Sequence, residues 1–198
     1  MKRVAGILLV AFLQALYAQD IAAGKILLAH PDLPDPNFAH TVVLLVHTGE
    51  DGAMGLILNR PAKITLEKLF PQLQIPNGGD PVYSGGPVEE QIGVALLRSS
   101  AKLSTKPTEP LRVAGDVYML TDKNLLEKTV RSGKEAASFR VYVGYSGWGP
   151  SQLDQELAVD AWTILPFRAE TVFDTEPATL WDRLNQKSQL RIATLLIP

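Results

Sequence analysis

One stretch of the chain contains more residues with unusual backbone properties than any other. It reads Val143-Gly144-Tyr145-Ser146-Gly147-Trp148-Gly149-Pro150-Ser151. Its glycines permit conformations and close contacts that other residues do not tolerate, and its proline cannot continue a strand ladder. The alternation before it predicts a strand from Phe139 to Tyr145, and Ser151 with Asp154 has the spacing of a helix capping box. We therefore expect a strand, a glycine turn and a helix in this order.

The apolar and turn-forming segments of the whole chain predict an α+β protein. Short strands are expected at 24–29, 41–47, 53–58, 82–84, 92–97, 117–120, 139–145 and 161–165, and helices at 66–70, 123–131, 152–157 and 177–187. Asp122 is expected to be the N-cap of the helix at 123–131. The apolar tail from Ile192 to Ile197 can add a last edge strand. Most strands are compatible with antiparallel pairing, and the helices are short and irregularly placed. This arrangement is typical of the α+β class rather than of regular βαβ alternation.

The N-terminus has the layout of a secretory signal peptide. Lys2 and Arg3 precede an almost continuously apolar run at 4–13, and a less hydrophobic end leads to Ala18. This order predicts cleavage after Ala18, export to the periplasm or outside, and a single domain from 19 to 198. The alternative is a buried first strand or helix of a cytoplasmic protein.

Charge and composition exclude several functions. Loss of Lys2 and Arg3 would lower the 19 basic residues to 17 against 21 acidic residues, so the formal net charge would fall from −2 to −4. An acidic chain without basic clusters is not expected to have a broad nucleic-acid surface. The absence of cysteine excludes disulfides, thiol catalysis and thiolate metal sites. No apolar stretch is long enough to predict a transmembrane helix in the mature chain.

Catalytic interpretations of the glycine-rich stretch fail on spacing. A nucleophile elbow around Ser146 needs glycine two residues to either side, but Trp148 occupies the second position. The glycines match neither a dinucleotide fingerprint nor a phosphate-binding loop, because no Gly-Lys-Ser or Gly-Lys-Thr occurs. We therefore assign no catalytic residue and no cofactor. A serine hydrolase that uses Ser84 or Ser146 with a histidine remains the weakest alternative.

The three histidines do not predict a metal site. His30, His40 and His47 lie close in sequence, but positions 40 and 47 are an odd number apart. Along a strand this spacing turns their side chains to opposite faces. No metal is therefore expected.

Three features remain as candidates for binding. The turn Ser84-Gly85-Gly86-Pro87 can present backbone N–H groups to an anion, or it is a plain turn. Arg60, at a predicted strand end, can hold a carboxylate or phosphate, or it can form an internal salt bridge or carbonyl clamp. Trp148 is either a lid over the core or an exposed recognition anchor.

Several motifs in one order resemble the YqgE/AlgH family across residues 22–185. They are Asp35-Pro36-Asn37-Phe38, Gly52-Ala53-Met54-Gly55-Leu56-Ile57-Leu58-Asn59-Arg60-Pro61, Gly85-Gly86-Pro87-Val88, Gly144-Tyr145-Ser146-Gly147-Trp148 with Gln152-Leu153, and Phe173-Asp174-Thr175 with Leu180-Trp181. The resemblance implies one α+β domain in which short, mostly antiparallel strands form a bent, partly open, barrel-like sheet with short helices packed outside.

The same resemblance implies little about activity. The family is bacterial and largely uncharacterised, its members are usually cytoplasmic, and some are labelled transcriptional regulators. It supplies no catalytic residue, so only candidate binding positions are carried over. They are Asn59, Arg60, Ser84, Gly85, Gly86, Pro87, Gly144, Tyr145, Gly147, Trp148, Gly149 and Gln152.

We therefore expect a non-enzymatic binding or regulatory domain that recognises a protein, a peptide or a small anion. The alternative from a second class is a transcriptional regulator that acts directly on DNA or through a partner. The acidic mature chain weighs against direct DNA binding.

Overall fold

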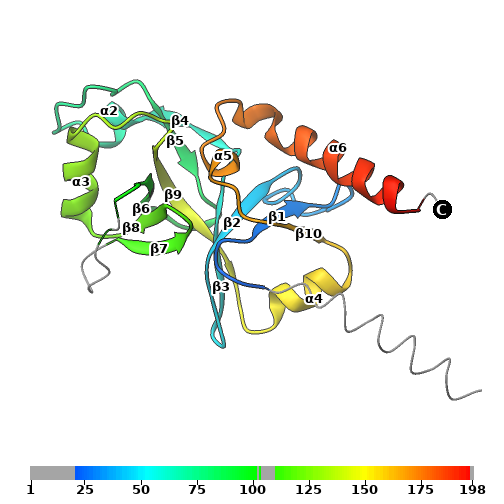
Figure 1. Ribbon diagram of the computed structural model, residues 1–198. Helices are drawn as coiled ribbons and strands as arrows, with labels where there is room; N and C mark the ends of the chain where they lie inside the picture. Colours follow the sequence, from blue (N-terminus) through cyan, green and yellow to red (C-terminus); the bar gives the residue numbers. More distant parts are fainter. Residues whose placement is uncertain (1–20, 102, 104–109, 197–198) are drawn as a thin grey trace, which may run out of the picture.

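The computed structural model describes residues 21–101, 103 and 110–196, and it shows a ten-stranded sheet flanked by helices (Figure 1). The strands are β1 (Ile26–Ala29), β2 (Val42–Gly49), β3 (Gly52–Ile57), β4 (Pro61–Thr65), β5 (Pro81–Ser84), β6 (Val88–Arg98), β7 (Leu111–Ala114), β8 (Val117–Leu120), β9 (Phe139–Trp148) and β10 (Trp162–Leu165). The helices are α2 (Leu66–Leu69), α3 (Lys123–Arg131), α4 (Gln152–Ala158), α5 (Ala169–Val172) and α6 (Pro177–Leu196).

The sheet is bent and is not closed into a barrel. Its strand order is β10-β1-β2-β3-β9-β6-β8-β7, and β5 attaches β4 to the side of β9. Neighbouring strands pair antiparallel except for β5 and β9, which run parallel. The α+β class and the mostly antiparallel sheet predicted from the sequence are therefore confirmed.

One predicted feature near the end of the chain is wrong. The apolar tail adds no edge strand, because α6 continues to Leu196 and no proline or glycine interrupts it before Pro198. The strand β3 ends at Ile57, and Pro61 begins β4, an irregular strand beside β5 that the sequence did not predict. A proline is tolerated at the first position of an edge strand because no ladder N–H is required there. The segments β7 and α5 were not predicted either.

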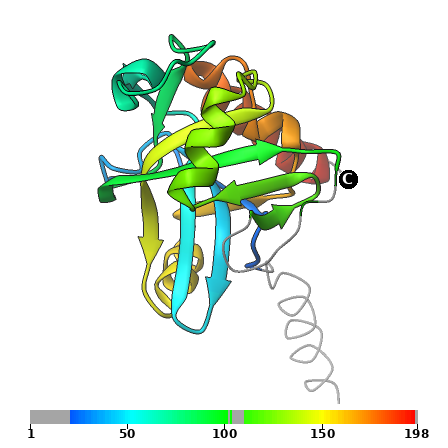
Figure 2. The same cartoon turned by 90° about the vertical axis from the view of Figure 1, so that its left-hand side faces the viewer.

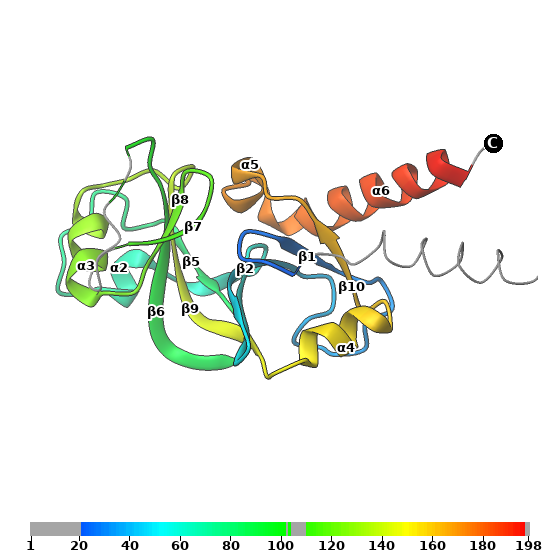
Figure 3. The ribbon, with the colours of Figure 1, turned by 60° about the horizontal axis from the view of Figure 1, so that its bottom comes forward.

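The buried side chains form two clusters, one on each side of β6 and β9. Figure 3 shows α3 on one side of these strands and β1, β10 and α6 on the other. Successive side chains of a strand point to opposite faces, so Val141 of β9 enters the cluster under α3 while Tyr142 enters the other. The two long strands thus connect both halves of the core.

A buried arginine joins β9 to the segment between α5 and α6. Arg140 Nη1 donates to the carbonyl of Val172 at 3.1 Å, and Nη2 donates to the carbonyl of Asp174. Its guanidinium also lies 4.7 Å from the centre of the Tyr83 ring. Because carbonyls at a helix C-terminus favour a cation, Arg140 fixes the end of α5. The Asp174 carboxylate instead accepts from Arg183 Nη2 at 2.6 Å, which anchors the start of α6.

The start of α3 offers a direct test of the fold. The Asp122 side chain accepts a hydrogen bond from the Leu125 backbone N–H at 2.8 Å, as the sequence predicted for this N-cap. We expect Asp122→Ala to lower the free energy of unfolding by about 1 kcal/mol. The neighbouring change Thr121→Ala, at an exposed position, serves as control and should stay within about 0.5 kcal/mol of wild type. Equal effects in urea denaturation would contradict the capping role.

Candidate functional site

The two glycine turns singled out in the sequence pack against each other inside the protein. The backbone N–H of Gly85 donates to the Val143 carbonyl at 2.9 Å, and the Gly85 carbonyl accepts from Ile57 N–H at 3.0 Å. A Cβ added to Gly85 would lie 2.3 Å from the Gly144 oxygen, and one added to Gly86 would lie 2.4 Å from the Ser146 nitrogen. These positions therefore require glycine because two backbones approach closely. At Gly85, the hydrogen-bonding groups are used within the fold.

Ser146 takes part in the same contact. Its side chain is fully buried, and its hydroxyl donates to the Gly85 carbonyl at 3.0 Å. Each histidine has a different partner: His30 and His47 lie beside Asp32 and Asp51, and the ring of His40 packs on Trp181. The arrangement at Ser146 therefore serves packing.

Trp148, at the end of β9, lies in the core with 4% of its surface exposed. Its ring stacks on Phe38 at 5.9 Å between centroids and meets the edge of Trp162 at 6.0 Å. Of the two interpretations of this tryptophan, a lid over the core matches this position. The exposed surface of the turn is made by its neighbours Gly147, Gly149, Pro150 and Ser151.

A single carboxylate holds both of these indoles. Glu156 Oε2 accepts from Trp148 Nε1 at 2.9 Å and from Trp162 Nε1 at 2.7 Å. Its other oxygen accepts from Gln152 Nε2 at 2.9 Å, and Gln152 Oε1 in turn accepts from the Gly149 backbone N–H at 3.0 Å. The α4 side chains thereby fix the turn that precedes the helix.

The expected capping box at the start of α4 is wrong. Ser151 occupies the N-cap position but its side chain makes no capping hydrogen bond, and its backbone is left-handed with φ of 58°. The N-cap geometry needs an extended backbone, which this residue does not have. The backbone of Ser151 is therefore in a conformation that non-glycine residues rarely adopt.

Asn59 and Arg60 hold the beginning of β2. Asn59 accepts from the Val42 N–H at 2.9 Å and donates to the His40 carbonyl at 2.9 Å. Arg60 Nη1 donates to the Asn37 carbonyl at 2.7 Å, which is the geometry of a carbonyl clamp. Burial lowers the pKa of Arg60, and the negative charge of Asp35 opposes that shift. Both side chains are thus used to fix the loop before β2.

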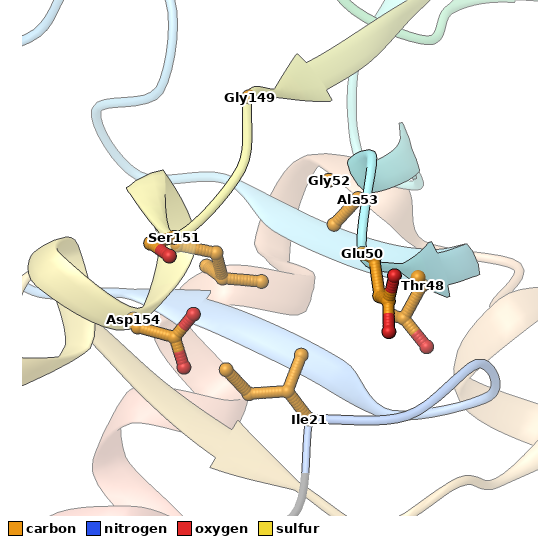
Figure 4. Close-up of a pocket in the computed structure, with 10 residues that line it drawn as sticks. Ile21, Thr48, Glu50, Gly52, Ala53, Gly149, Ser151 and Asp154 are labelled. Atoms are coloured by element: carbon orange, nitrogen blue, oxygen red, sulfur yellow. The ribbon is translucent and has the colours of Figure 1, made fainter.

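An open hollow of about 420 Å³ lies where the hairpin of β2 and β3 meets the turn after β9. Figure 2 shows this hairpin in cyan beside the yellow end of β9. The hollow is lined by Ile21, Thr48, Gly49, Glu50, Gly52, Ala53, Gly149, Ser151, Leu153 and Asp154. In Figure 4, Thr48 and Glu50 form one wall, Ser151 and Asp154 form the other, and Ile21 lies between them.

The register of the sheet explains why these segments meet. Ala53 of β3 pairs with Trp148 of β9, and Gly52 approaches the Trp148 carbonyl so closely that an added Cβ would lie 2.1 Å from it. The hairpin tip is therefore held against the turn that follows Trp148. Among the candidate residues predicted from the sequence, only Gly149 lines the hollow.

The sequence contained a signal for this hollow that its motifs did not reveal. Both wall-forming segments lie in stretches without lysine or arginine, namely 26–59 and 141–167, although both stretches carry acidic residues. Such a pattern predicts an acidic surface once the fold brings the stretches together.

Neither a metal-binding cluster nor a membrane-spanning helix is found in the described part of the chain. It has no cluster of three or more histidine, cysteine, aspartate or glutamate residues able to hold a metal ion. None of its helices is long and apolar enough to cross a membrane. The predicted signal peptide, residues 1–18, lies outside the described residues.

The fold and the hollow define an α+β protein with an open sheet, buried signature turns and an exposed acidic hollow. The chain belongs to the DUF179 family, described as AlgH-like, which it matches over residues 26–193. The predicted family resemblance is thereby confirmed.

Known relatives cover most of the chain. A UPF0301 protein of Nitrosococcus oceani is 37% identical over 161 residues, which is 79% of this chain and 83% of that protein. The solution structure of the AlgH protein from Pseudomonas aeruginosa is 31% identical, has a TM-score of 0.66 and is matched over 89% of both chains. A Corynebacterium diphtheriae protein with 20% identity and a TM-score of 0.70 covers 89% of this chain and shares the fold.

Because the two glycine turns are in close contact, adding one methyl group at Gly85 should strongly lower the stability of the protein. We expect Gly85→Ala to destabilise the protein by about 3 kcal/mol or more, because the new Cβ meets a backbone oxygen that cannot move aside alone. Gly79→Ala is the matched control, since a Cβ there meets nothing within 4 Å. It should be neutral or stabilising by about 0.5 kcal/mol. Similar unfolding midpoints for the two variants would refute the close-packing explanation.

The carboxylate between the two tryptophans yields a second prediction. Glu156→Ala leaves two buried indole N–H groups without their acceptor, so we expect a loss of about 2 kcal/mol in stability. Gln155→Ala, at an exposed position of the same helix, should change stability by less than about 0.5 kcal/mol. Tryptophan fluorescence should also shift to longer wavelength in the folded Glu156→Ala variant only. An unchanged spectrum and midpoint would show that Glu156 does not hold the indoles.

Proposed function

We propose that this protein is a non-enzymatic binding domain that takes a segment of a partner protein into the hollow between the β2–β3 hairpin and α4. The observation that carries the proposal is the shape and chemistry of this hollow. Its rim is polar and exposed, and Leu153 and Ala53 supply apolar surface inside it. Concave sites with an apolar interior and a few convergent polar groups are the usual form of ligand sites.

The strained residue at the rim also supports the proposal. Ser151 lines the hollow and is one of four non-glycine residues with positive φ among the described residues. Backbone strain of this kind is maintained only where the surrounding structure enforces it, and it is frequent at binding sites. Beside Ser151, the Gln152 side chain accepts from the Gly149 N–H of the turn and donates to Glu156, so the turn is held on the side of α4.

The other two functional classes have less support. A hydrolase at Ser146 would need a free nucleophile, whereas this hydroxyl is buried and donates to Gly85. A small anion or DNA would meet the carboxylates of Glu50 and Asp154 in the hollow, and like charges repel. A regulatory role is compatible with the proposal in the form of action through a bound partner protein.

Filling the hollow tests this function. A random-peptide phage library selected on the wild-type protein should yield peptides that shift the amide signals of residues 48–53 and 149–154. We expect Asp154→Trp, which covers the hollow, to weaken these peptides by about tenfold or more. Gln155→Trp, the next exposed residue of α4 and not part of the lining, should bind them as wild type does.

Two results would contradict the proposal. Selected peptides that shift other residues and ignore Asp154→Trp would place the binding surface elsewhere. Labelling by a fluorophosphonate probe that disappears in Ser146→Ala would show a reactive serine, and the protein would then be an enzyme.

A further inference from the structure

The two charged groups of the hollow come from opposite walls. Figure 4 shows the carboxylate of Glu50 on the hairpin side and that of Asp154 on the α4 side. Both side chains are exposed, and neither has an ion-pair or hydrogen-bond partner among the residues that the structure describes. The neighbouring Asp51 is engaged with His47 at 3.5 Å. The hollow thus presents two carboxylates that have no ion-pair partner among the described residues, although Asp154 also lies in the first turn of α4, where a helix favours negative charge.

The wall segments 48–53 and 149–154 contain no lysine or arginine, and no ion pair joins Glu50 or Asp154 to a basic residue of the described chain. The nearest basic residues along the chain are Lys25 and Arg60 on either side of the hairpin, and Arg140 and Arg168 on either side of the turn. Arg60 is engaged with the Asn37 carbonyl, and Arg140 is buried against α5. A cation in the hollow would relieve the repulsion between the carboxylates, whereas an anion would add to it.

The uncharged part of the lining fits an aliphatic arm that ends in an ammonium group. Ile21, Ala53 and Leu153 offer apolar surface, and the hydroxyls of Thr48 and Ser151 can accept hydrogen bonds. A lysine side chain combines a flexible four-carbon stem with three donors in different directions. Two carboxylates on separate walls can both approach the compact ammonium group of a lysine. They fit the planar guanidinium of an arginine less well, because that group pairs best with one carboxylate.

A divalent cation fits this lining less well than a lysine. Calcium takes six to eight oxygen ligands as a rule, and the described residues contain no metal-binding cluster of three. We propose that the hollow binds a lysine side chain that the partner segment presents, with Glu50 and Asp154 as its charge partners. This inference rests on the proposed function, because it names the chemical group of the partner segment that the same hollow recognises.

Three blocked peptides of one sequence, with a central lysine, acetyl-lysine or glutamate, test the inference by titration into isotope-labelled full-length protein. The lysine peptide should shift the amides of 48–53 and 149–154. Acetyl-lysine should bind about tenfold more weakly and glutamate more weakly still. Glu50→Gln and Asp154→Asn should each weaken the lysine peptide about threefold at low salt, with the difference shrinking as salt rises. Glu127→Gln is the matched control, because Glu127 lies on α3 and does not line the hollow. This variant should leave binding unchanged.

The alternative outcomes separate this inference from the proposed function. Equal binding of lysine and acetyl-lysine peptides in the hollow would overturn the charge assignment and leave the peptide-binding function intact. Calcium that displaces the lysine peptide far more strongly than sodium at equal ionic strength would reassign the carboxylates to a metal. No shift with any of the three peptides would also overturn the inference, while the library-selected peptides decide separately on the binding function.

Discussion

The close approach of two backbones, at Gly85 and Gly144, is the contact on which the rest of this structure depends. It sets β5 parallel to β9, and the same glycine carbonyl accepts from Ile57 at the end of β3. A side chain at either position would separate three strands at their crossing point. The family motif around these glycines is therefore explained by packing, and its sequence pattern is no evidence of a reaction.

The consequence of this crossing is the position of Trp148. Because β9 pairs with β3 beyond the glycines, the Trp148 ring packs against Phe38 and Trp162. Glu156 accepts hydrogen bonds from both indoles. Burial of the ring pulls the following turn inward against the hairpin. Together these contacts create the exposed hollow. The buried residues of the motif therefore position the walls of the hollow, although their own side chains do not line it.

Sequence patterns predicted those parts of the fold that local chemistry determines. The α3 boundaries and the Asp122 cap follow from periodicity and capping preference, and the structure confirms them. The hollow did not follow, because its walls are distant in sequence and meet only through the pairing of Ala53 with Trp148. The Ser151 cap failed for a different, local reason: the Gln152 side chain accepts from the Gly149 N–H, and Ser151 has a left-handed backbone instead of the extended one that a cap needs. Charge patterning was the one signal that pointed to the hollow, since two long stretches lack basic residues.

The glycine and tryptophan motifs support the fold, and we propose that the hollow beside them binds the ligand. A crystal structure of the protein with a library-selected peptide distinguishes these roles. We expect peptide density between Glu50 and Asp154, with Trp148 still buried and the Gly85 turn unchanged. Peptide density along the Gly85–Pro87 turn, or a Trp148 side chain rotated outward onto the peptide, would contradict the proposal.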